Sequence, residues 1–169
     1  AKDVLARHSG NAVRRFFYST HYRAPINYTE EQLDLFDKKA NKFASARKRA
    51  SCTLQLNNVE KKPVIESDYN EFMSSLANDL NVSNARAVVD KDIKERNSLL
   101  RKKPLDLEKL SSIFETLNKF FSILGLIFET PVVSEEDKAR YNDYRKAREE
   151  KDFATSDKLR PILRQKGLL

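Results

Sequence analysis

Glycine is scarce in this chain, which contains only three glycines among its 169 residues. Sandwiches and barrels of β-strands need many tight turns, and glycine is the residue that most readily adopts the positive φ angles of such turns. Three glycines are also too few for most loops that hold phosphate groups. The scarcity therefore favours helices, and a chain of this length is typical of one domain with a core of its own.

The composition is typical of a helical protein inside the cell. Charged residues make up 34% and hydrophobic residues 40% of the chain, as in amphipathic helices with long basic side chains on the surface. The single cysteine, Cys52, can form no internal disulfide, which favours a reducing compartment. The longest apolar stretch, residues 120–128, is too short for a membrane span. We therefore predict a cytoplasmic protein without a membrane partner. Because the chain begins without Met, where a helix is already expected to form, we also predict a piece of a longer chain.

The spacing of apolar and capping residues predicts an all-α fold, a bundle of roughly six to eight helices. The expected helices are 3–8, 12–18, 29–53, 67–79, 83–102, 106–125, 134–151 and 153–165, with a loop at 55–66. The helix 106–125 has the most apolar face, so we expect it at the centre of the core. N-caps are expected at Thr29, Ser67, Ser83, Asp106 and Ser134. Gly167 is expected just after the last helix, and Pro161 inside that segment requires a kink or a helix start nearby.

Positive charge is concentrated in the first third of the chain. Residues 1–50 hold 11 basic and 5 acidic side chains, so +6 of the net charge of +7 lies there. On the helix that follows Thr29, the side chains of Lys38, Lys42 and Arg49 fall within about 40° of one another, nearly opposite the apolar stripe. Further positive charge stands at Arg23, in a loop between two tyrosines, and in the basic run 101–103 at a helix end.

This charge distribution indicates a polyanionic partner such as RNA. Our candidate RNA-binding residues are Arg23, Lys38, Lys42 and Arg49. Charge alone does not separate this interpretation from a second one, in which a solvated helix face carries surplus lysines.

Catalytic and metal-binding patterns are missing from the sequence. His8 and His21, the only histidines, lie in different segments, and no cysteine or second histidine stands at the spacing of a metal site. No nucleophile stands beside a base and an orienting acid in a recognisable pattern. We therefore predict no catalytic residue and no metal ligand in this chain.

Three stretches, in the same order along the chain, resemble the cysteinyl-tRNA synthetase family. Residues 2–28 carry the runs Arg15-Phe16-Phe17 and His21-Tyr22-Arg23-Ala24-Pro25, similar to the segment that follows the KMSKS loop in that family. Residues 76–85 resemble its Asp-Asp-Phe-Asn-Thr-Pro-x-Ala stretch, and residues 145–160 resemble a helix pair near its end. Two positions depart from the pattern: Ala24 stands where serine is common, and Pro161 replaces an acidic residue.

The resemblance implies the part of a class I cysteine–tRNA ligase that follows the catalytic domain. It divides the chain into stem-contact helices at 1–54, a loop at 55–66 and a DALR-type helical bundle at 67–169, which stops before the anticodon-reading region. The implied function is to position tRNA(Cys) while the upstream catalytic domain of the same chain attaches cysteine. The resemblance implies ATP and zinc for the complete enzyme and no cofactor for this part, and we expect a monomer.

Two alternatives remain open on the sequence. The paralogous ligase that joins cysteine to an amino sugar shares the helical region and uses no tRNA. In such a ligase the basic stripe formed by Lys38, Lys42 and Arg49 would have no function. The chain could instead be a protein-interaction module that docks through the 120–128 region, provided that Ile123, Ile127 or Phe128 is exposed.

Overall fold

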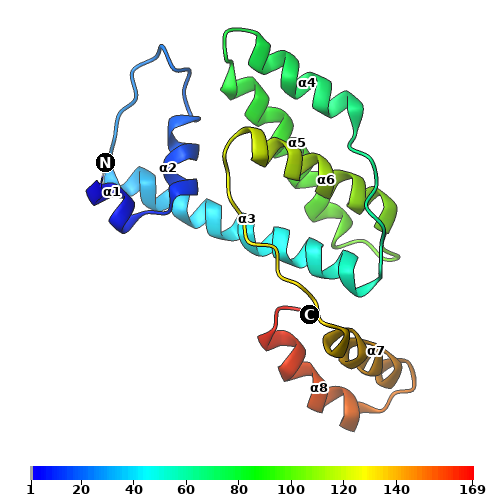
Figure 1. Cartoon of the computed structure of the whole chain (residues 1–169). Helices are drawn as coiled ribbons and strands as arrows, with labels where there is room; N and C mark the ends of the chain where they lie inside the picture. Colours follow the sequence, from blue (N-terminus) through cyan, green and yellow to red (C-terminus); the bar gives the residue numbers. More distant parts are fainter. Residues whose placement is uncertain (1) are drawn as a thin grey trace.

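The computed structural model describes residues 2–169, and over these residues it contains eight α-helices and no β-strand (Figure 1). The predicted all-α fold is therefore confirmed. The helices are α1 (Lys2–Arg7), α2 (Gly10–Phe17), α3 (Glu30–Leu56), α4 (Glu66–Ala77), α5 (Val82–Leu99), α6 (Leu107–Ile123), α7 (Glu135–Glu149) and α8 (Phe153–Gln165). No helix within residues 2–169 combines the length and the apolar character that crossing a bilayer requires.

Three of the five expected N-caps are confirmed. The side chains of Thr29, Asp106 and Ser134 each accept a hydrogen bond, of 3.2, 3.0 and 3.1 Å, from the backbone N–H three residues further on. Each bond satisfies one of the N–H groups that the first turn of a helix leaves without a partner. These caps set the starts of α3, α6 and α7.

The expected caps Ser67 and Ser83 are wrong. α4 begins one residue before Ser67, with no side-chain hydrogen bond at its N-cap. α5 is capped by Asn81, whose side chain accepts a hydrogen bond of 3.1 Å from the backbone N–H of Asn84. Asparagine and serine cap helices equally well, so the residue type does not decide which of Asn81 and Ser83 is the cap; the position in the backbone does. Asp79 and Leu80 have φ angles of 51° and 49°, which end the preceding turn and bring Asn81 to the start of α5.

Two glycines end helices in the left-handed conformation, as Gly167 was expected to do. Gly125 has a φ of 65° and Gly167 a φ of 72°. In each case the N–H of the next residue returns to a carbonyl five residues earlier, with bonds of 2.8 Å after α6 and 2.9 Å after α8. The last helix does not start near Pro161 but passes through it, and Pro161 is exposed.

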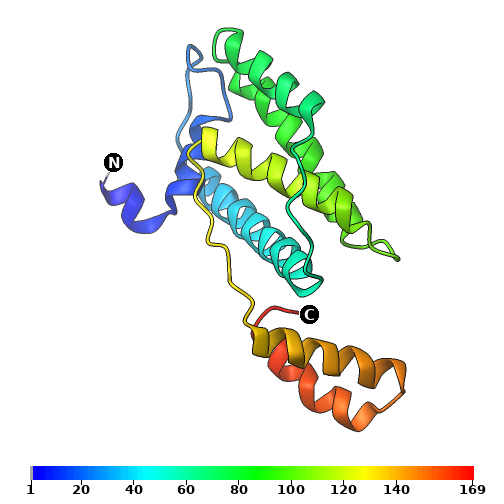
Figure 2. The ribbon, with the colours of Figure 1, turned by 45° about the vertical axis from the view of Figure 1, so that its right-hand side comes forward.

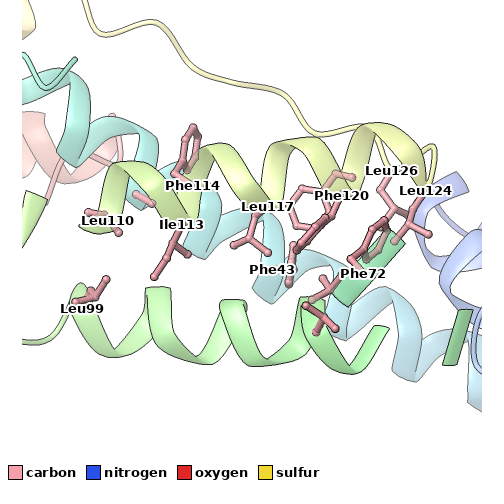
Figure 3. Close-up of a cluster of buried hydrophobic side chains, with 14 of the residues drawn as sticks. Phe43, Phe72, Leu99, Leu110, Ile113, Phe114, Leu117, Phe120, Leu124 and Leu126 are labelled. Carbon is pink, nitrogen blue, oxygen red and sulfur yellow. The ribbon is translucent and has the colours of Figure 1, made fainter. Parts of the chain in front are cut away.

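The main core lies where α3, α4, α5 and α6 meet. α6 contributes the largest apolar face, so the expected position of this helix is confirmed (Figure 3). The rings of Phe72 on α4 and Phe120 on α6 stack with their centroids 4.2 Å apart, and both side chains are fully buried. α3 enters the same core through Phe43, Ala50 and Leu54.

A second, smaller core joins the α7–α8 hairpin to the end of α3. It contains Cys52, Leu56, Val133, Leu163 and Leu168. In both views the hairpin lies apart from the other helices and is reached by an extended segment after α6 (Figure 1, Figure 2). α3 extends to Leu56 and contributes buried side chains to both cores.

Candidate nucleic-acid interface

The three stripe residues Lys38, Lys42 and Arg49 lie on the exposed side of α3. All three side chains are exposed. On the opposite side of the same helix, Leu33, Ala40 and Ala50 are buried. The amphipathic pattern of α3 is therefore real: burial of the apolar side leaves the cationic side in water.

Two of the three stripe residues meet a second basic element at a surface groove. Lys42 and Arg49 line this groove from α3, and Arg101 lines it from the end of α5. The groove has a volume of about 560 Å³, and its remaining lining residues are Asn41, Ser45, Ala46, Asn97 and Leu100. We call it the α3–α5 groove. Lys38 is not among the lining residues, so the stripe and the groove are not the same surface.

The chemistry of the α3–α5 groove suits an extended anion. Three cationic side chains and no carboxylate occur among its described lining residues. Asn41, Asn97 and Ser45 add neutral groups that can donate or accept hydrogen bonds. The Arg49 Nη2 atom donates a hydrogen bond of 3.5 Å to the backbone carbonyl of Leu100, another lining residue of the groove. Such a surface can bind phosphate groups, and nothing in it can act as an activated nucleophile.

Sequence reasoning did not include Arg101 among the site residues. The signal was present, because residues 101–103 form a basic run at a helix end. The sequence does not show that the end of α5 lies close to the outer face of α3. A contact between segments about fifty residues apart has no local pattern.

Arg47 lies on the same helix but has a different role. Its side chain is buried, and its Nε and Nη2 atoms donate hydrogen bonds of 3.2 and 2.9 Å to Asn118 Oδ1. Its Nη1 atom donates a third, of 3.1 Å, to the carbonyl of Glu129. The guanidinium also lies 5.2 Å from the ring centre of Phe114, and burial lowers the pKa of Arg47. Arg47 therefore ties α3 to α6 and to the segment that follows α6.

Arg23 lies outside the groove, in the loop between α2 and α3. Its Nη2 atom forms an ion pair of 3.1 Å with Asp79 Oδ1, and its Nε atom donates a hydrogen bond of 2.8 Å to the Tyr22 hydroxyl. The Tyr22 hydroxyl in turn donates a hydrogen bond of 2.7 Å to Asp79 Oδ1, which raises the pKa of Tyr22. Of the four predicted site residues, Lys42 and Arg49 therefore share the groove. Lys38 lies on α3 outside the groove, and Arg23 is paired with the carboxylate of Asp79.

The histidines serve structural contacts. His8 is buried, with its Nδ1 atom 2.6 Å from Asp37 Oδ2 and its Nε2 atom 3.2 Å from Glu30 Oε1. The hydrogen bond to Asp37 is the main reason why the pKa of His8 is raised. The His21 Nε2 atom lies 3.1 Å from the backbone carbonyl of Asp79. Within residues 2–169, no three His, Cys, Asp or Glu side chains gather in an arrangement that could hold a metal ion.

Ile123 and Ile127 satisfy the condition set for an interaction module, because both are exposed. Phe128 is half-buried and packs against Phe43 and Phe121, with ring centres 5.5 and 5.1 Å apart. The apolar surface after α6 thus reduces to single exposed side chains, which are common on protein surfaces.

Comparison with known protein families matches residues 71–129 to the DALR domain. These residues comprise most of α4, all of α5 and α6, and the segment after α6. The match therefore includes Arg101 and Asn97 of the α3–α5 groove but not α3.

The whole chain is similar to cysteine–tRNA ligases. It is 32% identical over 178 residues to the one from Malacoplasma penetrans, and the alignment covers 100% of this chain and 38% of that protein. It is 31% identical to the one from Campylobacter lari, with 99% of this chain and 38% of that protein covered. With the one from Leptospira interrogans the identity is 32%, over 94% of this chain and 35% of that protein. The chain thus spans little more than a third of the length of these relatives.

Proposed function

We propose that this chain is the tRNA-binding helical portion of a cysteine–tRNA ligase, a proposal supported by the DALR match at residues 71–129 and by the similarity of the whole chain to such ligases. In this proposal it holds tRNA(Cys) while a class I catalytic domain, upstream in the same chain, attaches cysteine. ATP and zinc belong to that catalytic domain. Residues 2–169 offer no group of side chains for a metal ion, so we assign the metal no step here.

The α3–α5 groove is the observation that carries this proposal. Lys42, Arg49 and Arg101 offer cations from two helices to one extended anion. Their contacts with phosphate release counterions, and three such contacts predict that log K falls with log salt with a slope of about −2 to −3. Phosphate contacts position an RNA without reading its sequence, so we expect the chain to bind tRNA weakly and with little selectivity.

A charge-reversal experiment tests the proposal. The triple variant Lys42→Glu, Arg49→Glu, Arg101→Glu should abolish the binding of a tRNA(Cys) transcript in a filter assay at low salt. A matched control reverses three exposed lysines outside the groove, with Lys61→Glu, Lys94→Glu and Lys119→Glu. If both triples lose binding equally, net charge alone attracts the RNA and the groove is not the site. Unchanged binding by the first triple would also reject the groove, and no affinity of the unmodified chain would favour the amino-sugar ligase.

A second comparison separates the groove from the stripe. Arg101→Glu changes a groove residue that is absent from the stripe, whereas Lys38→Glu changes a stripe residue outside the groove. We expect Arg101→Glu to weaken binding more than Lys38→Glu. The reverse order would place the RNA along α3 instead.

An interaction module is the second candidate function, supported by the exposure of Ile123 and Ile127. We propose a monomer, since these are isolated side chains. Analytical ultracentrifugation tests this: a concentration-dependent oligomer that disappears in Ile127→Ser would favour the module, and a monomer at all concentrations would favour RNA binding alone.

A further inference from the structure

Three neighbouring side chains of the α2–α3 loop converge on Asp79, in the turn between α4 and α5. In both views this loop rises beside that turn (Figure 1, Figure 2). Tyr22 and Arg23 each donate to the same oxygen, Asp79 Oδ1, at 2.7 and 3.1 Å. The His21 Nε2 atom lies 3.1 Å from the backbone carbonyl of Asp79 and 3.7 Å from the other carboxylate oxygen, Asp79 Oδ2. The carboxylate therefore occupies a site formed by a hydroxyl and a guanidinium, with the imidazole beside it.

The stacking of these side chains gives the site a defined shape. The rings of His21 and Tyr22 lie 4.7 Å apart with 30° between their planes. The guanidinium of Arg23 lies 5.3 Å from the centre of the Tyr22 ring, and its Nε atom donates to the Tyr22 hydroxyl. The three side chains thus contact one another as well as Asp79.

The bond to Asp79 is easily exchanged. The side chains of Arg23 and Asp79 are 68% and 49% exposed, and ion pairs with this exposure contribute little to stability. Asp79 also holds a φ of 51°, next to Leu80 at 49°, so the turn that presents the carboxylate has two consecutive non-glycine residues in the left-handed region.

We propose that Tyr22 and Arg23, beside His21, form a site for a phosphodiester of the bound RNA, and that Asp79 fills this site in the free chain. A phosphodiester resembles a carboxylate in the property that matters, because each carries one negative charge shared by two acceptor oxygens. Arginine binds both groups in the same forked geometry. The inference rests on the proposed function. It adds that the Asp79 carboxylate of the same chain competes with the RNA phosphate for Arg23.

Competition has a measurable consequence. RNA must displace Asp79 before it can use Arg23, so the apparent affinity is lowered by the fraction of molecules in which the site is filled. For an exposed ion pair the expected factor is about two to five. Removal of the Asp79 charge should therefore increase RNA affinity, although the variant loses a hydrogen-bonded ion pair.

Asp79→Asn is the variant that tests this. Asparagine tolerates the left-handed conformation, so the turn is kept while the charge is removed. The control is Asp143→Asn, which makes the same chemical change at an exposed position of α7. With a tRNA(Cys) transcript at fixed low salt, Asp79→Asn should bind about two- to fivefold more tightly than the unmodified chain, and more tightly than Asp143→Asn.

The double variant locates the effect. Arg23→Gln alone should weaken binding, and adding Asp79→Asn to Arg23→Gln should then raise the affinity by no more than Asp143→Asn does, because the competitor acts through Arg23. If Asp79→Asn leaves affinity unchanged or lowers it while circular dichroism and urea unfolding show a folded chain, Asp79 is a structural partner of Arg23 and the inference is wrong. A gain equal to that of Asp143→Asn reflects net charge and rejects it too.

These outcomes are separate from those of the charge-reversal triples. Binding that is lost in the α3–α5 groove triple but insensitive to Asp79→Asn would overturn only the competitor. Binding that is insensitive to the groove triple would overturn the groove, whatever Asp79→Asn does.

Discussion

The carboxyl groups of Asp92 on α5 and Asp68 on α4, two helices that pack together, interact electrostatically, and both residues are buried. Asp92 is fully buried, and no side chain or backbone group among the described residues donates a hydrogen bond to either of its oxygens. Asp68 is buried too, but it accepts a hydrogen bond of 2.6 Å from Lys91 Nζ. Burial, and next the charge of Asp68, raise the pKa of Asp92 to about 7. The neutral, protonated form of Asp92 avoids both the cost of a buried charge and the repulsion by Asp68.

This pair predicts that the chain loses stability as the pH rises from about 4 to about 7. The folded state binds the Asp92 proton more tightly than the unfolded state, whose carboxyl has a pKa of about 3.9. The free energy of unfolding therefore falls by up to about 1.4 kcal/mol per pH unit in this range. Asp92→Asn removes the charge and keeps a donor toward Asp68, so it should stabilise the chain at about pH 8 by on the order of 2 kcal/mol.

Urea unfolding at about pH 5 and about pH 8 measures this effect. Asp90→Asn, a half-buried position of the same helix, is the control and should show little of it. A destabilising effect of Asp92→Asn at the higher pH would mean that the charged form of Asp92 is the one that the native fold needs.

The contact between His8 and Asp37 predicts a second loss of stability as the pH rises, in a higher range than that of Asp92. The pKa of His8 is raised, so its contribution is complete below about pH 6.5 and is lost as the pH rises through the raised value. The pKa values of Asp37 and Glu30 are lowered, so their contribution is lost as the pH falls below about 4. His8→Gln should therefore destabilise the chain more at about pH 5.5 than at about pH 9. Thermal unfolding at the two pH values measures it, and Asp37→Asn combined with His8→Gln should add no further pH dependence.

The start of α5 predicts a difference between two neighbouring substitutions. Asn81→Ala removes the side chain that accepts the N–H of Asn84, and should lower the free energy of unfolding by about 1 kcal/mol. Ser83→Ala changes a residue inside the first turn, where alanine is well tolerated, and should change stability by less than about 0.5 kcal/mol. Equal effects in urea unfolding would show that the side chain of Asn81 is not the cap in solution.

Arg47 and Arg49 predict a separation of stability from RNA binding. Lysine cannot make the three hydrogen bonds that Arg47 donates to Asn118 and Glu129, so Arg47→Lys should cost about 2 kcal/mol of stability. It keeps the positive charge, so tRNA affinity should stay within about twofold. Arg49→Lys is the matched control at an exposed position and should leave stability unchanged. A loss of RNA affinity in Arg47→Lys larger than in Arg49→Lys would assign Arg47 to the binding surface.

Much of the fold follows from local patterns. The apolar face of α6, the caps Thr29, Asp106 and Ser134 and the terminating Gly167 are all readable in the sequence. Each depends on residues within about five positions, because helix caps and helix faces are formed by near neighbours. The cap of α5 was misjudged because Asn81 and Ser83 are equivalent as residue types, and the backbone of the preceding turn chooses between them.

The candidate site could be predicted only in part. Exposure of Lys42 and Arg49 follows from the amphipathic pattern of α3, whereas the presence of Arg101 beside them does not. Arg23 was recognised as a cation, and its partner Asp79 is 56 residues away in the chain. Burial of Arg47 depends in the same way on Asn118, 71 residues away.

The sequence by itself determined that this chain forms helices, where most of them begin and end, and that cationic residues gather on the outer face of α3. Those properties arise from interactions along a few turns of backbone. Only the tertiary structure decided which cations are free to meet an anion: Lys42, Arg49 and Arg101 share a groove, Arg47 is buried and Arg23 is held by Asp79. The reason is that an arginine has the same charge in each of these positions, and its availability depends on the acceptors that distant segments bring to it.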